Sequence, residues 1–338
     1  MHIYDLVIIG SGPAGMAAAI YAARAELDFL VIERSPIAGG QVQQTYEVDN
    51  YPGLPGLSGP ELSEQMRKHC DRLGVKFMTE EVRSLTRILP ESDNGTGTSD
   101  KASPDISGNN SPNPESGVYP DSEIFLIKTW DKNEYAAKCV IAASGAHHST
   151  LGIPGEEELA GAGVSYCATC DGAFFKNKVC AVVGGGDVAV EDAIYLSKLC
   201  TKVYLIHRRD EFRAAAKLVS EARSRDNIEF VTSCTPERIE GSGNVEKLII
   251  NDKKTGQERE LAVNGVFIAV GIKPENELFA DLADTDDKGY VIAGEDCVTS
   301  CPGLFAAGDL RGKPLRQIVT AAADGANAVT SVLKHLGA

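Results

Sequence analysis

The sequence predicts an α/β protein with two Rossmann-like, three-layer ββα dinucleotide-binding domains, the first of them discontinuous. Two glycine-rich loops, Gly10-Ser11-Gly12-Pro13-Ala14-Gly15 and Gly184-Gly185-Gly186-Asp187-Val188-Ala189, each follow an apolar run and precede helix-forming residues. Two buried-strand patterns that end in small residues, 139–145 and 266–271, each come after one of these loops. We infer that the same module occurs twice in the chain.

Composition is that of an ordinary globular protein. The chain has 338 residues, 43% hydrophobic and 24% charged, which is enough for about two domains. Its formal net charge of −15 argues against nucleic acid or an anionic membrane surface as a partner. No apolar run approaches the roughly 20 residues of a membrane helix, and the N-terminus lacks a signal-peptide pattern. We therefore expect a cytoplasmic protein.

The first module is expected to begin with a buried parallel strand over 6–9. The first glycine loop, a helix over 16–24 and a strand over 29–32 follow, and the strand ends at Glu33. The glycines let the backbone approach a pyrophosphate at the helix N-terminus. Glu33 lies 18 positions after Gly15, near the ~20 typical of an acid that binds ribose hydroxyls. Because an acid repels a 2′-phosphate, this site should take FAD or NAD and not NADP.

Less regular sequence follows the first two strands. Gly39-Gly40-Gln41 and the loop around Asn50 are either turns or groups that bind a flavin. A helix over 61–73 and a strand over 75–78 come next. The segment 90–121 is dominated by Ser, Asn, Asp, Gly and Pro, which predicts a flexible surface insertion between two strands. A partner-binding arm is the alternative for this insertion.

The second module repeats the order of strand, glycine loop and helix, with strands over 179–183 and 203–206 and a helix over 190–199. Its second strand ends at His207-Arg208-Arg209, with Arg213 one helical turn further on. Guanidinium groups match phosphate oxygens bidentately, so this strand end suits a 2′-phosphate. A basic surface cluster at a helix start is the alternative, which such an acidic chain disfavours. The second site should therefore bind NADPH.

The stretch Cys167-Ala168-Thr169-Cys170-Asp171 lies between the two glycine loops. Two thiols at this spacing form a redox disulfide or half of a zinc site, and a neighbouring carboxyl group can exchange the accompanying proton. No second ligand pair for zinc is evident, so we expect no metal. The nine cysteines are an odd, scattered set, which fits a reducing compartment. Cys297 and Cys301 are either neighbours on a helix turn or two buried thiols.

The C-terminal part is expected to complete the first domain. A strand over 302–307 ends at Gly308-Asp309, and Pro314 to Ile318 opens a small-residue helix over 319–336. Because this part follows the second module, we assign 1–145 and 272–338 to the first dinucleotide-binding domain, which takes FAD or NAD. We assign 146–271 to an NADPH-binding domain that carries the cysteine pair.

These motifs in combination resemble the low-molecular-weight, bacterial-type thioredoxin reductases of the FAD/NADPH pyridine nucleotide-disulfide oxidoreductase family. The resemblance implies a homodimeric reductase that passes electrons from NADPH through FAD and the Cys167–Cys170 disulfide to thioredoxin or a thioredoxin-like protein. It implies FAD contacts from Gly10, Gly12, Pro13, Ala14, Gly15, Glu33, Arg34, Gly39, Gly40, Gln41, Asn50, Gly308, Asp309, Arg316, Gln317 and Ile318. It implies NADPH contacts from Gly184, Gly186, Asp187, Val188, Ala189, His207, Arg208, Arg209 and Arg213.

Within this hypothesis Cys170 is the sulfur that faces the flavin, and Asp171 is a general acid–base group or, alternatively, a turn cap. The family rotates its smaller domain, and Gly145 and Gly271 are candidate pivots. A flavin-dependent dithiol oxidase, or another disulfide reductase on the same scaffold, is the alternative function. The arginines after 206 argue against an oxidase, because an oxidase has no need of NADPH.

Overall fold

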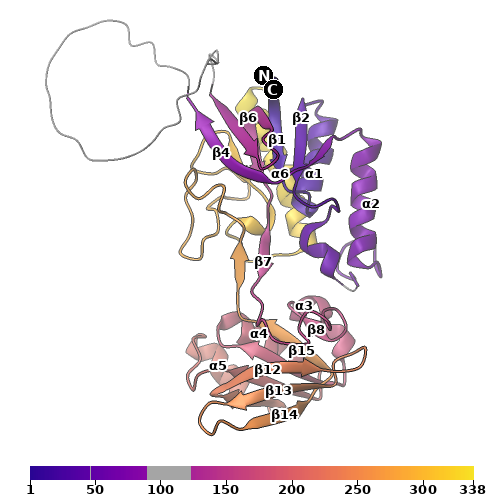
Figure 1. Ribbon diagram of the computed structural model, residues 1–338, viewed down its shortest axis with the longest axis vertical. Coiled ribbons are helices and arrows are strands. Elements are labelled where there is room, and N and C mark those ends of the chain that lie inside the picture. The colour runs from indigo at the N-terminus through magenta and orange to yellow at the C-terminus, as the bar shows by residue number, and fades with distance from the viewer. Residues whose placement is uncertain (46, 90–122) are drawn as a thin grey trace, which may run out of the picture.

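The computed structural model describes residues 1–45, 47–89 and 123–338. The predicted insertion at 90–121 lies outside these residues. The described chain forms two sheet-based units, one above the other, which two adjacent strands join (Figure 1). Both termini lie at the far end of the first unit. The α/β class is confirmed.

The first unit is built on a seven-stranded sheet of order β3-β2-β1-β6-β5-β4, with β17 also paired to β6. Strands β1, β2, β3, β6 and β17 are parallel, whereas β4 and β5 are antiparallel. The strands are β1 (Ile3–Ile9), β2 (Phe29–Glu33), β3 (Phe77–Thr79), β4 (Val82–Ile88), β5 (Ile124–Thr129), β6 (Glu134–Ala142) and β17 (Leu304–Ala306). The helices are α1 (Pro13–Arg24), η1 (Gly40–Gln44), α2 (Gly59–Arg72), η3 (Gly308–Leu310) and α6 (Ile318–Leu336). A C-terminal strand and helix thus complete an N-terminal sheet, as the sequence predicts.

The second unit holds a parallel five-stranded sheet of order β11-β10-β9-β15-β8 and an antiparallel sheet of order β12-β13-β14. The strands are β8 (Val164–Ser165), β9 (Val179–Gly184), β10 (Lys202–His207), β11 (Ile228–Thr232), β12 (Cys234–Glu240), β13 (Lys247–Asp252), β14 (Glu258–Ala262) and β15 (Gly265–Ala269). The helices are α3 (Ala168–Asp171), η2 (Gly172–Phe175), α4 (Asp187–Ser197) and α5 (Ala216–Arg223). The orders β3-β2-β1-β6 and β11-β10-β9-β15 correspond strand for strand, which confirms the predicted repeat.

One local expectation is wrong. Residues 208–215 form no helix, because Phe212 packs on His207 with ring centroids 4.9 Å apart and the Arg213 amide donates to Gly185 at 2.8 Å. Arg213 therefore follows an irregular segment held against the second glycine loop, and α5 begins only at Ala216. For Cys297 and Cys301 the second of the two alternatives is confirmed, because they are separate, buried, free thiols that share no helix turn.

The two units are joined by a ribbon of two antiparallel strands, β7 (Ala146–His148) and β16 (Ile272–Pro274). Gly145 and Gly271 precede these strands with φ of +78° and +138°, values that favour glycine. Figure 1 shows the ribbon as the crossing between the units. The domain boundaries that we propose, 145/146 and 271/272, fall at the starts of the two ribbon strands.

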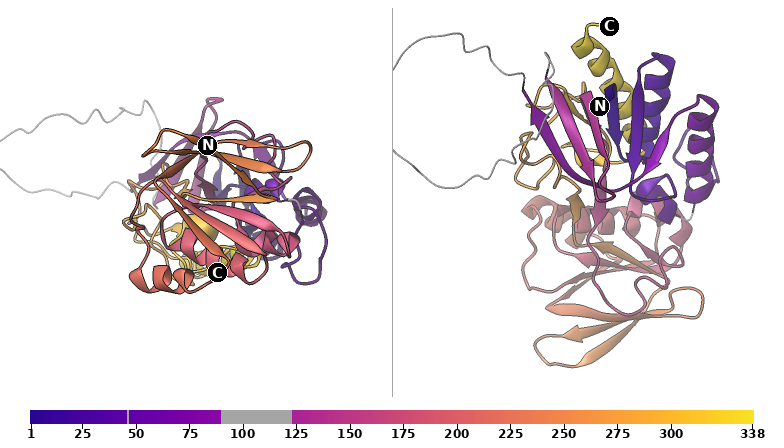
Figure 2. Two further views of the ribbon diagram at one scale, coloured as in Figure 1. Left: turned by 90° about the horizontal axis from the view of Figure 1, so that it is seen from below. Right: turned by 45° about the horizontal axis from the view of Figure 1, so that its top comes forward.

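Helices α1 and α6 lie side by side against one face of the first sheet (Figures 1 and 2). Small residues allow the approach: a Cβ added to Gly325 of α6 would stand 2.2 Å from Ala14 O and 2.7 Å from Ala18 N of α1. The small residues of α6 thus pack closely on α1. Among the described residues no helix is long and apolar enough to cross a membrane.

Replacing Gly325 with Ala should lower the free energy of unfolding by about 1–3 kcal/mol, because the new methyl group overlaps backbone atoms that cannot move aside freely. Urea denaturation followed by circular dichroism measures the effect. Gly312→Ala is the matched control, since its Cβ would meet nothing nearer than 3.8 Å. Equal stability of the two variants would show that the helices are not in backbone contact.

Candidate functional site

The predicted redox cysteines form a disulfide at the start of α3. Cys167 and Cys170 are bonded, with their Cα atoms 5.3 Å apart, and Cys167 Sγ also accepts the Cys170 amide at 3.2 Å as the helix N-cap. The other seven cysteines are buried free thiols. Because burial stabilises the neutral thiol, burial raises the pKa of Cys70, Cys139 and Cys297 to about 12. The partly exposed pair is thus distinct from the inert cysteines.

The disulfide lies where the second unit contacts the first. Gln317, the N-cap residue of α6, places its Nε2 3.9 Å and its Oε1 4.0 Å from Cys170 Sγ. The same Oε1 accepts a hydrogen bond from Asn50 Nδ2 at 2.9 Å. The structure therefore brings together residues more than a hundred positions apart that the sequence assigned to the flavin and to the disulfide. Cys170, and not Cys167, is the sulfur on this side.

Asp171 ends α3 with one carboxylate oxygen engaged and one free. Ser165 Oγ lies 2.6 Å from its Oδ2, whereas its Oδ1 is buried without a hydrogen-bond partner. Burial raises the pKa of Asp171, and the bond from Ser165 opposes that rise. The side chain makes no capping bond to η2, so the turn-cap alternative has no support. A buried carboxyl group of raised pKa suits proton transfer.

The first glycine loop connects β1 to α1, with Glu33 beside it. The Glu33 carboxylate accepts bonds from Ser11 N at 2.7 Å, Ser11 Oγ at 2.8 Å and Ser35 N at 2.9 Å. A Cβ on Gly12 would meet no atom nearer than Gly39 O at 4.0 Å, so the loop has an open side there. The Gly39 amide donates to Ser11 O at 2.9 Å, which draws the predicted Gly39-Gly40-Gln41 segment to the same loop.

The segment between β17 and α6 carries Asp309, Arg316 and Gln317, and Ile318 is the first residue of α6. Asp309 Oδ1 is buried without a hydrogen-bond partner; the nearest cation, Lys313 Nζ, is 3.6 Å away. Burial raises the pKa of Asp309, with Lys313 and Arg316 opposing. Arg316 stacks on Tyr290, 3.8 Å from its ring centroid, and reaches Asp309 O at 3.5 Å, so it braces this loop.

Arg34, which the sequence assigned to the cofactor, turns toward the ribbon instead. Its Nη2 lies 2.9 Å from Glu275 Oε1, directly after β16. It lies next to Glu33 in the chain but shares no partner with it. Its assignment as a cofactor contact stays a prediction.

A buried ionic cluster of Arg311, Lys313 and Asp324 escaped the sequence reasoning. Arg311 binds Asp324 through both Nε at 2.9 Å and Nη2 at 2.7 Å, and Lys313 Nζ adds a bond at 2.9 Å. Their side chains are 2–4% exposed. Burial would raise the pKa of Asp324, but the two cations hold it below its ordinary value. The sequence contains a signal for this cluster, because Asp324 interrupts the small apolar face of α6. A buried acidic residue in such a face requires a cationic partner.

The second glycine loop joins β9 to α4. A Cβ on Gly186 would meet nothing within 4 Å, which leaves room for a bulky group such as phosphate. Asp187 does not face this space unpaired, since its Oδ1 accepts the Ala215 amide at 2.8 Å. Ala189 is fully buried beneath the loop, whereas Val188 is half exposed. Gly184, the last residue of β9, is buried against Ala189 and Ala269.

The end of β10 carries the predicted basic cluster. Arg208, Arg209 and Arg213 are exposed, and none forms an ion pair within the described residues. His207 differs from them: it is buried under Gly185, its Nε2 has no hydrogen-bond partner, and burial lowers its pKa, as do the nearby arginines. Three unpaired guanidinium groups beside an open glycine loop fit a phosphate monoester.

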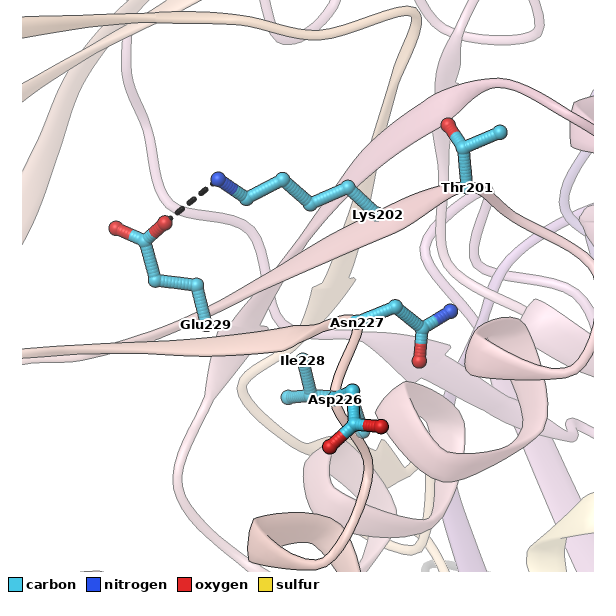
Figure 3. Close-up of a pocket in the computed structure, with 6 residues that line it drawn as sticks. All are labelled: Thr201, Lys202, Asp226, Asn227, Ile228 and Glu229. Atoms are coloured by element: carbon cyan, nitrogen blue, oxygen red, sulfur yellow. Dashed lines mark ion pairs between the residues drawn. The ribbon is translucent and has the colours of Figure 1, made fainter.

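An open hollow of about 540 Å³ is lined by Thr201, Lys202, Asp226, Asn227, Ile228 and Glu229 (Figure 3). Lys202 and Glu229 form an ion pair across it at 2.7 Å. Lys202 begins β10, whereas His207 ends it, so the hollow lies at the opposite edge of the sheet from the glycine loop. Cofactors of this fold bind at the carboxyl ends of the strands. The hollow is thus not part of the cofactor site.

The sequence profile of the pyridine nucleotide-disulphide oxidoreductases matches residues 4–325. The chain belongs to this family. Like members of the family, it combines dinucleotide-binding modules with a disulfide. No group of three or more His, Cys, Asp or Glu side chains in the part of the chain that the structure describes is arranged to hold a metal.

Within the pyridine nucleotide-disulphide oxidoreductase family, the similar proteins are thioredoxin reductases. The chain is 41% identical to thioredoxin reductase from Bacillus subtilis over 99% of this chain and 95% of that protein. It is 40% identical to the thioredoxin reductase structure from Streptococcus pyogenes, with a TM-score of 0.85 over 99% of this chain and 98% of that one. For Lactococcus lactis thioredoxin reductase (FR conformation) the identity is 39% and the TM-score 0.60, over 99% of each chain. These matches confirm the resemblance and the fold with two dinucleotide-binding domains.

Replacing Arg208, Arg209 and Arg213 with Ala should raise the KM for NADPH at least tenfold and leave the KM for NADH unchanged. The reason is that each lost charge-assisted bond to a 2′-phosphate costs about 1.5–3 kcal/mol. Steady-state kinetics with both nucleotides measure the split. Arg225→Ala, which removes an arginine paired with Glu221 at 3.1 Å, is the control. Equal losses with NADPH and NADH would contradict the assignment.

Replacing Asp324 with Asn should cost about 3–5 kcal/mol of unfolding free energy, because two buried cations would lose their counter-charge. Chemical denaturation measures this loss. Glu295→Gln serves as the control: Glu295 also contacts Arg311, at 3.1 Å, but its side chain is 84% exposed, so little change is expected. A loss below about 1 kcal/mol for Asp324→Asn would show that the cluster is hydrated.

Proposed function

We propose that this protein is an NADPH-dependent thioredoxin-disulfide reductase that carries FAD and acts through the Cys167–Cys170 disulfide on thioredoxin or a thioredoxin-like protein. One observation carries the proposal. The disulfide of the second unit lies against Gln317 of the first, at the predicted flavin site, while unpaired arginines follow the second glycine loop. A candidate nucleotide site, a candidate flavin site and a disulfide are thus combined in one chain.

The residues at the first site fit FAD. The loop Gly10–Gly15 is open at Gly12, Glu33 lies beside it for ribose hydroxyls, and Asp309 offers a buried unpartnered oxygen. The other residues of the proposed FAD set are Arg34, Gly39, Gly40, Gln41, Asn50, Gly308, Arg316, Gln317 and Ile318. When bound, FAD supplies a two-electron carrier between NADPH and the disulfide.

The cysteine pair then performs thiol–disulfide exchange. Reduction breaks the Cys167–Cys170 bond and adds two electrons and two protons. A thiolate of the pair attacks the partner's disulfide, and one partner sulfur leaves as a thiolate. The second cysteine attacks the mixed disulfide, which restores the Cys167–Cys170 bond and frees the reduced partner. Asp171, next to Cys170 in the chain, supplies and removes protons.

Rotation of the second unit about the ribbon is part of the proposal. In this structure the disulfide lies against the first unit. The arginine cluster belongs to the proposed NADPH site. The disulfide and the NADPH site cannot both face the flavin in one arrangement of the two units. Two solved reductases of nearly equal identity and coverage give TM-scores of 0.85 and 0.60. This difference supports two arrangements of the same parts, with Gly145 and Gly271 as pivots.

We also propose a homodimer located in the cytoplasm. The homodimer follows the family resemblance. Seven free cysteines fit a compartment that keeps thiols reduced.

Replacing Cys170 with Ser should abolish NADPH-driven reduction of thioredoxin, because the dithiol can no longer form. NADPH should still reduce the bound flavin, which is measured by the flavin absorbance in the absence of oxygen. Cys234→Ser, which alters a free buried cysteine, is the control and should retain turnover. Undiminished thioredoxin reduction by Cys170→Ser would remove the disulfide from the reaction.

A further inference from the structure

Ser165 makes the only side-chain hydrogen bond of Asp171 within the described residues. It is the second residue of the short strand β8, which pairs with Phe267 of β15 in the five-stranded sheet. Ser165 is 5% exposed, and its Oγ lies 2.6 Å from Asp171 Oδ2. Ser165 Oγ also accepts a hydrogen bond from the Cys167 amide at 3.1 Å. One hydroxyl thus connects the sheet, the redox pair and the adjacent carboxyl group.

We infer that Ser165 is a positioning residue that holds Asp171 by Oδ2 and leaves Oδ1 as the oxygen that exchanges protons with the redox pair. This inference deepens the proposed function and rests on it. Ser165 touches neither sulfur, and it acts through Asp171.

The hydrogen-bond geometry fixes the direction of the hydroxyl. A serine hydroxyl has one proton to donate, and its two candidate acceptors are Asp171 Oδ2 at 2.6 Å and Cys167 O at 3.4 Å. The shorter contact, to a carboxylate, is the stronger one. The acceptor side of the hydroxyl is occupied by the Cys167 amide. Asp171 Oδ2 is therefore engaged in either protonation state, and the buried Oδ1 is left free.

The support for Ser165 comes from the sheet and not from α3. The strand of Ser165 is hydrogen-bonded to β15. Asp171, in contrast, ends a helix of four residues, and the disulfide at the N-terminus of that helix breaks and re-forms during the reaction. A tether to the sheet keeps the carboxyl group in place while the Cys167–Cys170 bond breaks and re-forms. Without it, Asp171 could turn toward solvent.

Charges near Asp171 are few, so the effect of Ser165 can be isolated. Burial and the Ser165 bond are the causes of its pKa shift, burial raising the pKa and Ser165 lowering it. On α4, which packs against α3, the titratable residues are Asp187, Glu191, Asp192 and Tyr195; on α6 the facing Gln317 is neutral. Loss of the hydroxyl should therefore raise the pKa of Asp171.

The experiment compares Ser165→Ala, Ser165→Thr and Asp171→Asn in the FAD-loaded protein. Infrared spectroscopy of the oxidised protein follows the carboxyl band that Asp171→Asn removes, as a function of pH. We expect its midpoint to move up by about 1–2 pH units in Ser165→Ala and to return in Ser165→Thr. Ser197→Ala, which removes a hydroxyl bond to Ile194 O at 2.7 Å in the same unit, should leave it in place.

A second measurement links the shift to turnover. Pre-reduced protein is mixed with oxidised thioredoxin at a series of pH values. The rate should fall as pH drops through the pKa of Asp171, because the carboxylate is the form that accepts a thiol proton. In Ser165→Ala this fall should begin at a pH higher by the same amount, and in Asp171→Asn it should be absent.

An infrared midpoint that is the same in Ser165→Ala and the unaltered protein would overturn the inference. Ser165→Val has the shape of the threonine variant without its hydroxyl, so it should give the same upward shift as Ser165→Ala if the alanine variant does not fold. The infrared measurement needs no thioredoxin. A shifted midpoint in a protein that cannot reduce thioredoxin would overturn the proposed function while supporting the role of Ser165.

Discussion

The buried carboxylate of Asp324 makes the interactions on which the arrangement of the proposed flavin site depends. It accepts bonds from the Gly308 amide, Arg311 and Lys313, and so ties the loop after β17 back onto the helix that follows it. That loop carries Asp309 and leads to Gln317, the residue that contacts Cys170. A charge placed inside α6 thus fixes the surface on which the second unit rests. Since a buried charge is stable only when it is paired, the loop has little freedom to adopt another course.

In the proposed function, the two modules have one backbone plan and two specificities. In both, a parallel strand ends beside a glycine loop, but the first ends in Glu33 and the second in His207, Arg208 and Arg209. The carboxylate is held by Ser11, which belongs to the loop itself, while the guanidinium groups form no ion pair within the described residues of a chain of net charge −15. In the proposed function, charge at a single strand end therefore separates a site for ribose hydroxyls from a site for a phosphate monoester.

The sequence was sufficient to predict the elements and the repeat that arise from local patterns. Glycine loops, strand ends and the cysteine spacing lie within short stretches, and the repeat of these stretches predicts both sheets and the C-terminal completion of the first. Contacts between distant segments were not predictable in this way. The Arg311–Lys313–Asp324 cluster, the meeting of Cys170 with Gln317 and the bond of Ser165 to Asp171 depend on how helices and strands pack. The prediction of a helical turn before Arg213 was wrong for the same reason. The contacts of Phe212 with His207 and of Arg213 with Gly185 determine the backbone course of 208–215.

The ribbon of β7 and β16 has a further consequence for how such a chain is built. Both passages of the backbone between the units run side by side and are hydrogen-bonded to each other, so everything from 149 to 271 leaves and returns at a single point. No strand of either large sheet is shared across that point. The inserted part is therefore structurally separable from the first sheet. Residues 145 and 275 are already adjacent, because the Glu275 amide donates to Gly145 O at 3.0 Å. Joining the chain from 145 to 275 would leave the first sheet with all seven of its strands.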